Sequence, residues 1–332
     1  MCHVYGNKFF NEVNRSSFKK FTIARFARVY PLHLLTLSYC IALFFIAARL
    51  GIPKIPVLQI DNNTYSIVTN LLLLHSMNFH NWFTWDHASW SISTEWWAYM
   101  IFPFLVAPFQ KLHKSSKAIV ALICVAGYWC IAFFIVPLVT VPKEIAFVKV
   151  DPAQLSINVA YQYGYLRCLC GFILGMVVYE AYKLNWLKNI FSNGYILLCL
   201  FLLVLLCMHF NLPDFITIIF FPFILLCGAF GSSGIDKLFS TTALQKLGDW
   251  SFSIYLTHQP LLFTIIAALT YLNPTDPNKA SLGPPPKPGM FTAWFICLGF
   301  ISLVLLVSHL TYKFFEVPVR NWINQKAKHY NI

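Results

Sequence analysis

The stretch that decides the fold is VYPLHLLTLSYCIALFFIAARL, residues 29–50, in which Arg49 is the first charged residue. About 20 apolar residues are what an α-helix needs to cross the roughly 30 Å hydrocarbon layer of a bilayer. Seven more segments of this kind follow, at about 90–110, 118–139, 160–180, 194–210, 214–230, 248–272 and 291–312. The chain is 58% hydrophobic and 11% charged, whereas soluble domains carry about 25% charged residues. These values exclude a soluble enzyme or a disordered chain, and predict an all-α polytopic membrane protein with eight transmembrane helices.

A ninth apolar stretch, Tyr65 to His75, has only about eleven residues and suits a re-entrant or interfacial helix better than a crossing. If residues 1–28 are cytoplasmic and this stretch does not cross, the cytoplasmic segments carry 17 of the 24 Lys and Arg residues. A crossing here would send the Lys111–Lys117 cluster outward, against the positive-inside rule. We therefore expect a cytoplasmic basic segment at 1–28, a transmembrane domain at 29–312 and a cytoplasmic tail at 313–332.

The chain has 24 Lys and Arg against 12 Asp and Glu. Such an excess is typical of membrane proteins, whose cytoplasmic loops are rich in Lys and Arg. Nucleic acid is not expected as a partner, because no basic face interleaved with aromatic residues lies on a soluble module. Most of the ten cysteines lie inside apolar stretches, and Cys168 and Cys170 are too close in sequence for a zinc pair. We expect neither a disulfide framework nor a metal site, and membrane lipid as the constant partner.

Arg167 is the clearest polar residue at membrane depth, near the start of the 160–180 span. Charged groups in a membrane are costly and mark functional sites by default. One interpretation is an arginine that snorkels to the outer interface. The other is a buried cation that faces a cavity and holds an anionic group or a carboxylate.

A second polar cluster lies between Trp82 and Tyr99, which includes five of the ten tryptophans. An interfacial aromatic belt, with Ser91 or Ser93 capping the next helix, explains most of it. Glu95 does not fit that interpretation, because it lies one turn past Ser91 on the same face and needs a polar partner. The nearby His75, His80 and His87 are each either a base or a structural histidine.

Two more clusters have a functional and a structural interpretation. At helical spacing Ser251, Tyr255 and His258 share one face, which predicts either a cavity lining or an interhelical hydrogen-bond seam. Arg25 and Arg28 are three residues apart at the cytoplasmic end of the first span. They form either a fork for phosphate or plain topological anchors.

Four motifs in this sequence resemble, in order, those of the acyltransferase 3 family of membrane O-acyltransferases. They are Arg25-x-x-Arg28-x-Tyr30-Pro31, Trp90-Ser91-Ile92-Ser93-Thr94-Glu95 with the later Pro103, Ser251-Phe252-Ser253-Ile254-Tyr255-Leu256-Thr257-His258, and Phe315-Glu316-Val317-Pro318. Together they extend over nearly the whole chain, and their shared order makes the resemblance specific.

The resemblance implies ten transmembrane helices and transfer of an acyl group, often acetyl, from cytoplasmic acyl-CoA. The implied acceptor is a hydroxyl of a cell-surface glycan or lipid-linked sugar. Acyl-CoA, with acetyl-CoA as the expected form, would be a co-substrate and not a permanently bound cofactor. The implied location is a bacterial inner membrane, with several passes and both termini cytoplasmic.

The resemblance also assigns roles to residues. Arg25 and Arg28 would bind the CoA phosphates. The acceptor side of the cavity would be formed by Trp90, Ser91, Arg167 and Tyr255, and the catalytic groups would be His258 and Glu95.

The start of the chain departs from the family pattern. Family members open with a helix that carries Arg, ten residues and then His, which serves as the base, and a second helix follows. Neither is found here, and Val4-Tyr5-Gly6 resembles the segment after that second helix. We therefore expect a family member without its first two helices, through a misplaced start or a truncation. Loss of a general base costs typically about 10²–10⁴-fold in rate, so this chain is also expected to be weak or inactive.

Two rival functions belong to other classes. A transporter for an anionic solute would use Arg167 and a polar outer cavity, and would show flux without acyl-CoA. A non-catalytic remnant of an acyltransferase would bind acyl-CoA and never transfer the acyl group.

Overall fold

The computed structural model describes residues 1–6, 9, 13–53, 55–148, 155–231, 239–272 and 289–329. Within these ranges the chain consists of helices and connecting loops, and none of the described residues is in a β-strand. Five helical stretches are long and apolar enough to cross a membrane: Arg15–Arg49, Lys114–Leu138, Gly164–Lys183, Thr242–Leu272 and Met290–His329. Two shorter apolar helices are Gly194–His209 and Asp214–Phe230. The predicted all-α chain with several apolar spans is confirmed, although five of the described helical stretches are long and apolar enough to cross, against the eight crossings predicted.

Helix α2 (Arg15–Arg49) begins well before the predicted span. The side chain of Asn14 accepts the Ser16 amide hydrogen at 2.9 Å and caps the helix. Pro31 lies inside α2, where it removes one backbone donor without ending the helix. The sequence changes from basic and polar to apolar near residue 28, but the helix continues through this point. A helix can leave the bilayer with its backbone hydrogen bonds intact.

The chain from 56 to 89 stays outside the long helices. It contains the short helices α3 (Pro56–Gln59) and α4 (Thr64–Leu71) and the 3-10 turn η2 (His87–Ser89). In α4, Asn63 and Ser66 form a capping box, which fixes where the helix starts. With eight residues α4 is about 12 Å long, so it does not cross a bilayer, as its sequence predicts.

Helix α5 (Trp90–Lys111) matches the predicted 90–110 span, and α6 (Lys114–Cys130) follows it and continues as a π-helical turn and a 3-10 turn to Leu138. After α7 (Gly164–Lys183) come α8 (Lys188–Phe191), α9 (Gly194–His209), α10 (Asp214–Ile218) and α11 (Phe220–Phe230). The last helices are α13 (Thr242–Leu272), α14 (Met290–Thr311) and α15 (Val317–His329), the last two joined by the π-helical turn η8 (Tyr312–Glu316).

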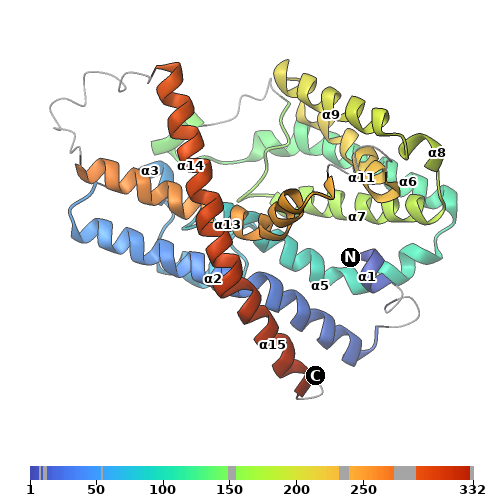
Figure 1. The fold of residues 1–332 in the computed structure, drawn as a ribbon, viewed down its shortest axis with the longest axis horizontal. Helices are drawn as coiled ribbons and strands as arrows, with labels where there is room; N and C mark the ends of the chain where they lie inside the picture. The colour runs from blue at the N-terminus through green and yellow to red at the C-terminus, as the bar shows by residue number, and fades with distance from the viewer. Residues whose placement is uncertain are drawn as a thin grey trace.

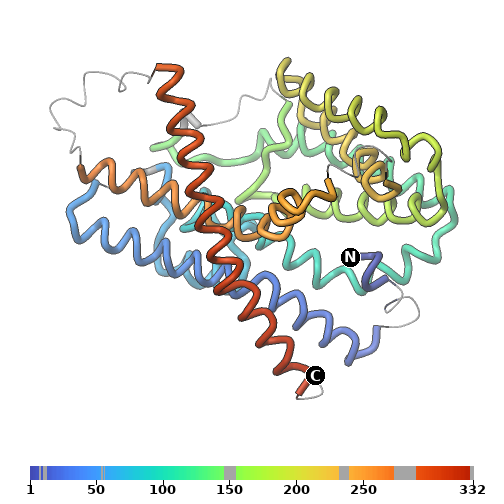
Figure 2. Tube along the Cα trace, viewed as in Figure 1, coloured from blue at the N-terminus to red at the C-terminus, as the bar shows by residue number. Residues whose placement is uncertain are grey.

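Figure 1 shows how the chain reverses. The α5–α6 and α7–α8 connections lie at the right-hand end, whereas the C-terminal ends of α2 and α13 lie at the left. The basic residues Lys111, Lys114 and Lys183 are therefore grouped at one end of the molecule. In Figure 2 the start of α2 (dark blue) and the end of α15 (dark red) both lie at the bottom of the view. The two helices contact each other.

The core that positions the site is formed where α2, α5 and α13 pack together. Its fully buried side chains include Phe21, Leu32, Ile92, Phe102 and Leu256, which come from all three helices. Between helices in a membrane, close van der Waals packing of such side chains stabilises the contact, because lipid tails are as apolar as the side chains themselves. Three of the four motif segments are therefore held against one another by apolar packing.

Candidate active site

A cavity of about 390 Å³ lies where α2, α5 and α13 meet. It is lined by Arg25, Arg28, Val29, Ser91, Ile92, Glu95, Tyr99, Ser251, Phe252 and Tyr255. The structure thus brings together residues of three motifs that lie up to 230 positions apart. Of the predicted site residues, Arg25, Arg28, Ser91, Glu95 and Tyr255 line this cavity.

Arg25 presents a positive charge to the cavity. Its Nη2 donates to the Tyr5 hydroxyl at 3.2 Å, and its guanidinium lies over the rings of Tyr5 and Tyr99, at 5.2 and 5.6 Å from their centroids. No carboxylate pairs with Arg25 in the described part of the chain, and its buried Nε has no partner there. Aromatic rings hold the guanidinium in place, and no ion pair with a described residue occupies it, which leaves it able to bind an anion, although Glu95 lines the same cavity.

Arg28 has a different environment. Its Nη1 donates to Glu316 Oε1 at 2.5 Å, and its guanidinium also lies over the ring of Phe252. Glu316 is buried and also accepts from Arg320 at 3.3 Å and from Ser253 at 2.7 Å. Two cations and one anion leave this cluster with a single positive charge beside the cavity. Motif resemblance singled out Glu316 but could not reveal that it pairs with Arg28.

The polar groups of α5 face the cavity. Ser91 Oγ donates to the Tyr255 hydroxyl at 2.8 Å, and the Tyr99 hydroxyl donates to Glu95 Oε1. The expectation that Ser91 or Ser93 caps α5 is wrong, because Ser93 Oγ instead donates to a backbone carbonyl at 2.7 Å. Ser89 is the N-cap residue and forms no side-chain cap bond, since the chain enters α5 directly from the 3-10 turn.

Arg167 and Trp90 lie together, but outside the lining of this cavity. The Arg167 guanidinium lies 4.5 Å from the centroid of the Trp90 ring, and its Nη1 donates to the Ile157 carbonyl at 3.3 Å. It is half-buried, and none of the described acidic residues forms an ion pair with it. The geometry therefore joins two predicted acceptor-side residues into one stacked pair at the start of α7.

The predicted polar stripe of α13 divides between two faces. Ser251 and Tyr255 line the cavity, whereas His258 does not, and its Nδ1 lies 2.6 Å from the Tyr255 carbonyl. On the other face, Thr257 Oγ1 lies 2.9 Å from Ser308 Oγ of α14. The predicted stripe of Ser251, Tyr255 and His258 therefore lines the cavity at its first two positions, and the hydrogen bond to α14 comes from Thr257, which was not part of that stripe.

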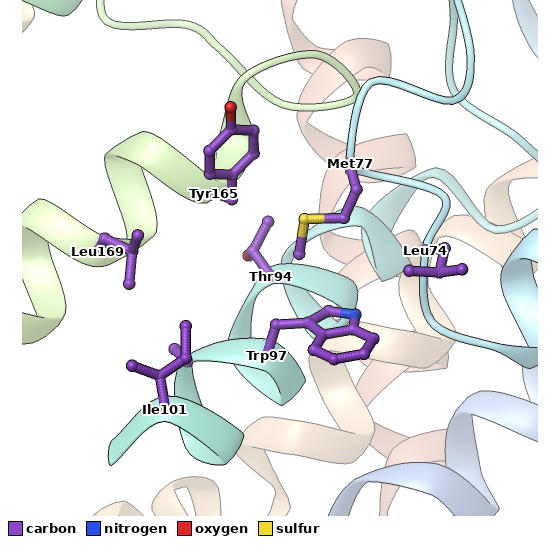
Figure 3. A pocket seen from close by; sticks show the side chains of 8 residues that line it. Leu74, Met77, Thr94, Trp97, Ile101, Tyr165 and Leu169 are labelled. Atoms are coloured by element: carbon purple, nitrogen blue, oxygen red, sulfur yellow. The ribbon is translucent and has the colours of Figure 1, made fainter. Parts of the chain in front are cut away.

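A second pocket, of about 310 Å³, lies against a different face of α5. Figure 3 shows Trp97, Thr94 and Ile101 of α5 facing Met77 and Leu74 on one side, and Tyr165 and Leu169 of α7 on the other. The Trp97 indole nitrogen donates to the Leu73 carbonyl at 2.9 Å, outside the pocket lining. Because its walls are almost entirely apolar, this pocket suits a hydrocarbon group and not a phosphate.

Comparison with known proteins gives one finding. A family model described as an acyltransferase domain matches residues 8–311 of this chain. No curated protein and no solved structure matches. The matched residues include the three helices that form the 390 Å³ cavity.

Proposed function

The chain belongs to the acyltransferase 3 family, whose members are acyltransferases, and on that premise we propose the donor, the acceptor and the residues of the transfer. The donor is cytoplasmic acyl-CoA, in its acetyl form, and the acceptor is a hydroxyl of a cell-surface glycan or lipid-linked sugar. One observation carries the proposal, which is that Arg25, which forms no ion pair among the described residues, shares a cavity with the hydroxyls of Ser91 and Tyr255.

The donor end of the cavity is basic. Arg25 supplies a guanidinium without an acidic partner, and the cluster of Arg28, Glu316 and Arg320 adds one net positive charge. Phosphate groups bind guanidinium through charge-assisted hydrogen bonds, which are roughly twice as strong as neutral ones. Arg25 is therefore the main contact for the CoA phosphates, and Arg28 holds the helices that form the site.

At the other end of the cavity, where the acyl group is transferred, the Tyr255 hydroxyl is a hydrogen-bond donor for the carbonyl oxygen of the thioester. The Tyr255 oxygen accepts a hydrogen bond from the Ser91 hydroxyl, and among the described residues no acceptor for the hydroxyl hydrogen of Tyr255 is found. That proton can point at the acyl carbonyl, where negative charge develops when the acceptor oxygen attacks. Ser91 fixes the position of the tyrosine oxygen, and so acts as a positioning residue.

Glu95 and His258 remain the candidate groups for proton transfer. Glu95 lines the same cavity as Arg25 and Tyr255 and accepts a hydrogen bond from the Tyr99 hydroxyl, which supports a role in proton transfer. His258 is one turn from Tyr255, and its Nδ1 faces a backbone carbonyl, so only Nε2 is available for chemistry. Trp90 and Arg167 form the neighbouring wall on the acceptor side.

The proposed location is the inner membrane of a bacterium, with eight crossings, α4 as a re-entrant or interfacial helix, and both termini in the cytoplasm. The grouping of basic connections at one end of the molecule supports this orientation. On this orientation the N-terminal half of α2, with Arg25, faces the cytoplasm, where acyl-CoA is found.

The test is acetyl-CoA binding and transfer by the full chain in nanodiscs. Arg25→Ala should weaken acetyl-CoA binding by at least tenfold, measured by calorimetry, and abolish transfer of label from [14C]acetyl-CoA to host membranes. Lys20→Ala removes the same charge from an exposed position on the same helix and should change neither. Equal binding by wild type and Arg25→Ala would overturn the proposal.

The same preparation separates the rival functions. Solute flux in liposomes without acyl-CoA would favour a transporter for an anionic solute. Binding of acetyl-CoA without any transfer in host membranes would favour a non-catalytic remnant.

A further inference from the structure

Buried polar atoms without a partner are concentrated at one place in the molecule. Seven such side-chain atoms are found among the described residues, and five of them lie in one cluster. The five are His33 Nδ1, Asn70 Oδ1, His75 Nδ1, Ser76 Oγ and Asp86 Oδ2. Each of these side chains is at most 4% exposed. Proteins leave few buried polar atoms unpaired, because desolvation without a hydrogen bond is costly.

Hydrogen bonds fix which ring nitrogens carry hydrogen. His33 Nε2 lies 3.1 Å from the Asn70 carbonyl, and His75 Nε2 lies 3.0 Å from the Ser89 carbonyl. A carbonyl can only accept, so each Nε2 donates and each Nδ1 is left as an acceptor. The carbonyl of Thr69 also lies beside the His75 ring, but it forms no hydrogen bond with Nδ1. The two rings are stacked, with centroids 5.6 Å apart and an angle of 4° between planes.

The amide and carboxyl of the cluster add two more acceptors. The Asn70 side-chain nitrogen donates to Thr84 at 2.8 Å and to the Ser66 carbonyl at 2.7 Å, which leaves its Oδ1 unpaired. Asp86 Oδ1 accepts the Ala88 amide hydrogen at 3.2 Å, while its Oδ2 has no hydrogen-bond partner among the described residues. The Thr36 hydroxyl lies near this carboxyl, but it donates to the His33 carbonyl at 3.2 Å. Four of the five unpaired atoms are therefore acceptors. Such a set needs a ligand that donates hydrogen bonds, and a hydroxyl group is the simplest one.

None of the five residues lines the cavity, but the cluster is linked along the chain and by hydrogen bonds to the lining residues Val29 and Ser91. His33 follows the cavity-lining Val29 by one turn of α2. His75 contacts Ser89, two residues before the cavity-lining Ser91. On the proposed orientation the cluster lies toward the outer side, where the acceptor must arrive.

We propose that this cluster receives the hydroxyl that is acylated, directly or through one bound water, and that Asp86 takes its proton. This proposal rests on the proposed function, because it names the acceptor end of the same reaction. On this proposal Asp86, and not Glu95 or His258, is the base, and it lies close enough to Tyr255 for its charge to act on that hydroxyl.

The step balances without any further reactant. The hydroxyl proton passes to Asp86 Oδ2, and the oxygen forms a bond with the thioester carbon as the C–S bond breaks. The CoA thiolate leaves and takes the proton back from the Asp86 carboxyl. Burial raises the pKa of Asp86 from 3.8 to about 7, although the nearby Thr36 hydroxyl and the Ala88 amide oppose the rise. A base with a pKa near the working pH is well suited to such a step.

The test compares Asp86→Asn with wild type in two assays on the full chain in nanodiscs. Asparagine keeps an oxygen that can accept from Ala88, so a purely structural role would survive. We expect acetyl-CoA binding within twofold of wild type and transfer from [14C]acetyl-CoA to host membranes reduced at least a hundredfold. Asp249→Asn, at an exposed position on α13, should change neither.

Retained transfer in Asp86→Asn would overturn this proposal while leaving the proposed function intact. Failure of wild type to bind acetyl-CoA would instead overturn the proposed function. If Asp86→Asn does not fold, Asp86→Glu keeps a carboxyl and should retain transfer with a shifted pH profile. An unshifted profile in that variant would contradict the assignment. Host membranes from which lipid-linked sugars have been extracted distinguish a sugar hydroxyl from water as the acceptor. Release of the label only as free acetate in such membranes means that the cluster activates water, which would overturn the assignment of a sugar hydroxyl.

Discussion

Arg28 Nη1 and Glu316 Oε1 lie 2.5 Å apart, although 288 positions separate the two residues in sequence. The bond joins the N-terminal half of α2 to the turn between α14 and α15. Ser253 donates to the other carboxylate oxygen at 2.7 Å, so α13 is tied to the same point. The two arginines of one motif therefore differ in environment, since Arg28 connects helices through Glu316, whereas Arg25 forms no ion pair among the described residues and is the residue proposed to bind the CoA phosphates.

Loss of the Glu316 charge should destabilise the fold. Glu316→Gln leaves Arg28 and Arg320 near each other without an anion, and breaking a buried pair costs about 3 kcal/mol. Thermal unfolding followed by native fluorescence should show a Tm lower by several degrees. Glu144→Gln, at an exposed position, is the matched control and should leave Tm unchanged. Equal Tm values for the two variants would contradict the structural role of the Arg28–Glu316 pair.

The Tyr255 hydroxyl should act on rate and not on donor binding. Tyr255→Phe removes the donor proposed for the thioester oxygen, and loss of one such donor costs about 10²–10³-fold in kcat. Ser91→Ala removes only the group that positions Tyr255, so its loss should be smaller. Initial rates at varied acetyl-CoA concentration separate kcat from KM. A change confined to KM would argue against a role for Tyr255 at the carbonyl.

The pH dependence of transfer should follow Asp86. Its raised pKa, about 7, means that the carboxylate needed as a base is present above that pH and is lost below it. The titratable groups near it are Cys40 of α2, Tyr255 of α13 and, through Ser89, His75. Burial lowers the pKa of His75 to about 3, so this ring stays neutral near pH 7.

We therefore expect the transfer rate to fall as the pH is lowered from 8 to 6. The same shift has an opposite effect on stability. Because the pKa of Asp86 is higher in the folded chain, its contribution favours folding below 3.8 and is lost as the pH rises toward 7. A rate that stays constant from pH 6 to 8 would exclude Asp86 as the base.

Close packing of α6 on α7 should make two glycines irreplaceable. A Cβ at Gly127 would lie 2.8 Å from Cys170 Sγ, and a Cβ at Gly171 would lie 2.8 Å from the hydroxyl of the buried Tyr128. Gly171→Ala should cost about 1–3 kcal/mol through overpacking. Gly228→Ala meets nothing within 4 Å and should be neutral or slightly stabilising. The free energies of unfolding of Gly171→Ala and Gly228→Ala would be compared by chemical denaturation in one detergent. Equal values for the two variants would contradict the close packing of α6 on α7.

The sequence predicts the apolar helices well because length and hydropathy decide them. The 118–139 and 291–312 segments correspond to the apolar helical stretch Lys114–Leu138 and to helix Met290–Thr311. The start of α2 at Arg15 could not be found in this way. Its first turns are polar, and their helical structure depends on the Asn14 cap and on packing against other helices.

The candidate site was predictable where chemistry follows from a local motif. Arg25, Glu95 and Tyr255 were identified from such motifs and line one cavity. The pairing of Arg28 with Glu316 and the buried cluster around His33 were not predictable. Both depend on contacts between distant segments, and single histidines or aspartates in an apolar sequence do not reveal them.

The most direct test of the central claim, that acyl-CoA binds between α2, α5 and α13, is a cryo-EM map of the protein in nanodiscs with acetyl-CoA. The account predicts CoA phosphate density within hydrogen-bonding distance of Arg25, and the thioester near the hydroxyls of Ser91 and Tyr255. Acetyl-CoA density elsewhere, with the cavity around Arg25 unoccupied by the ligand, would contradict it.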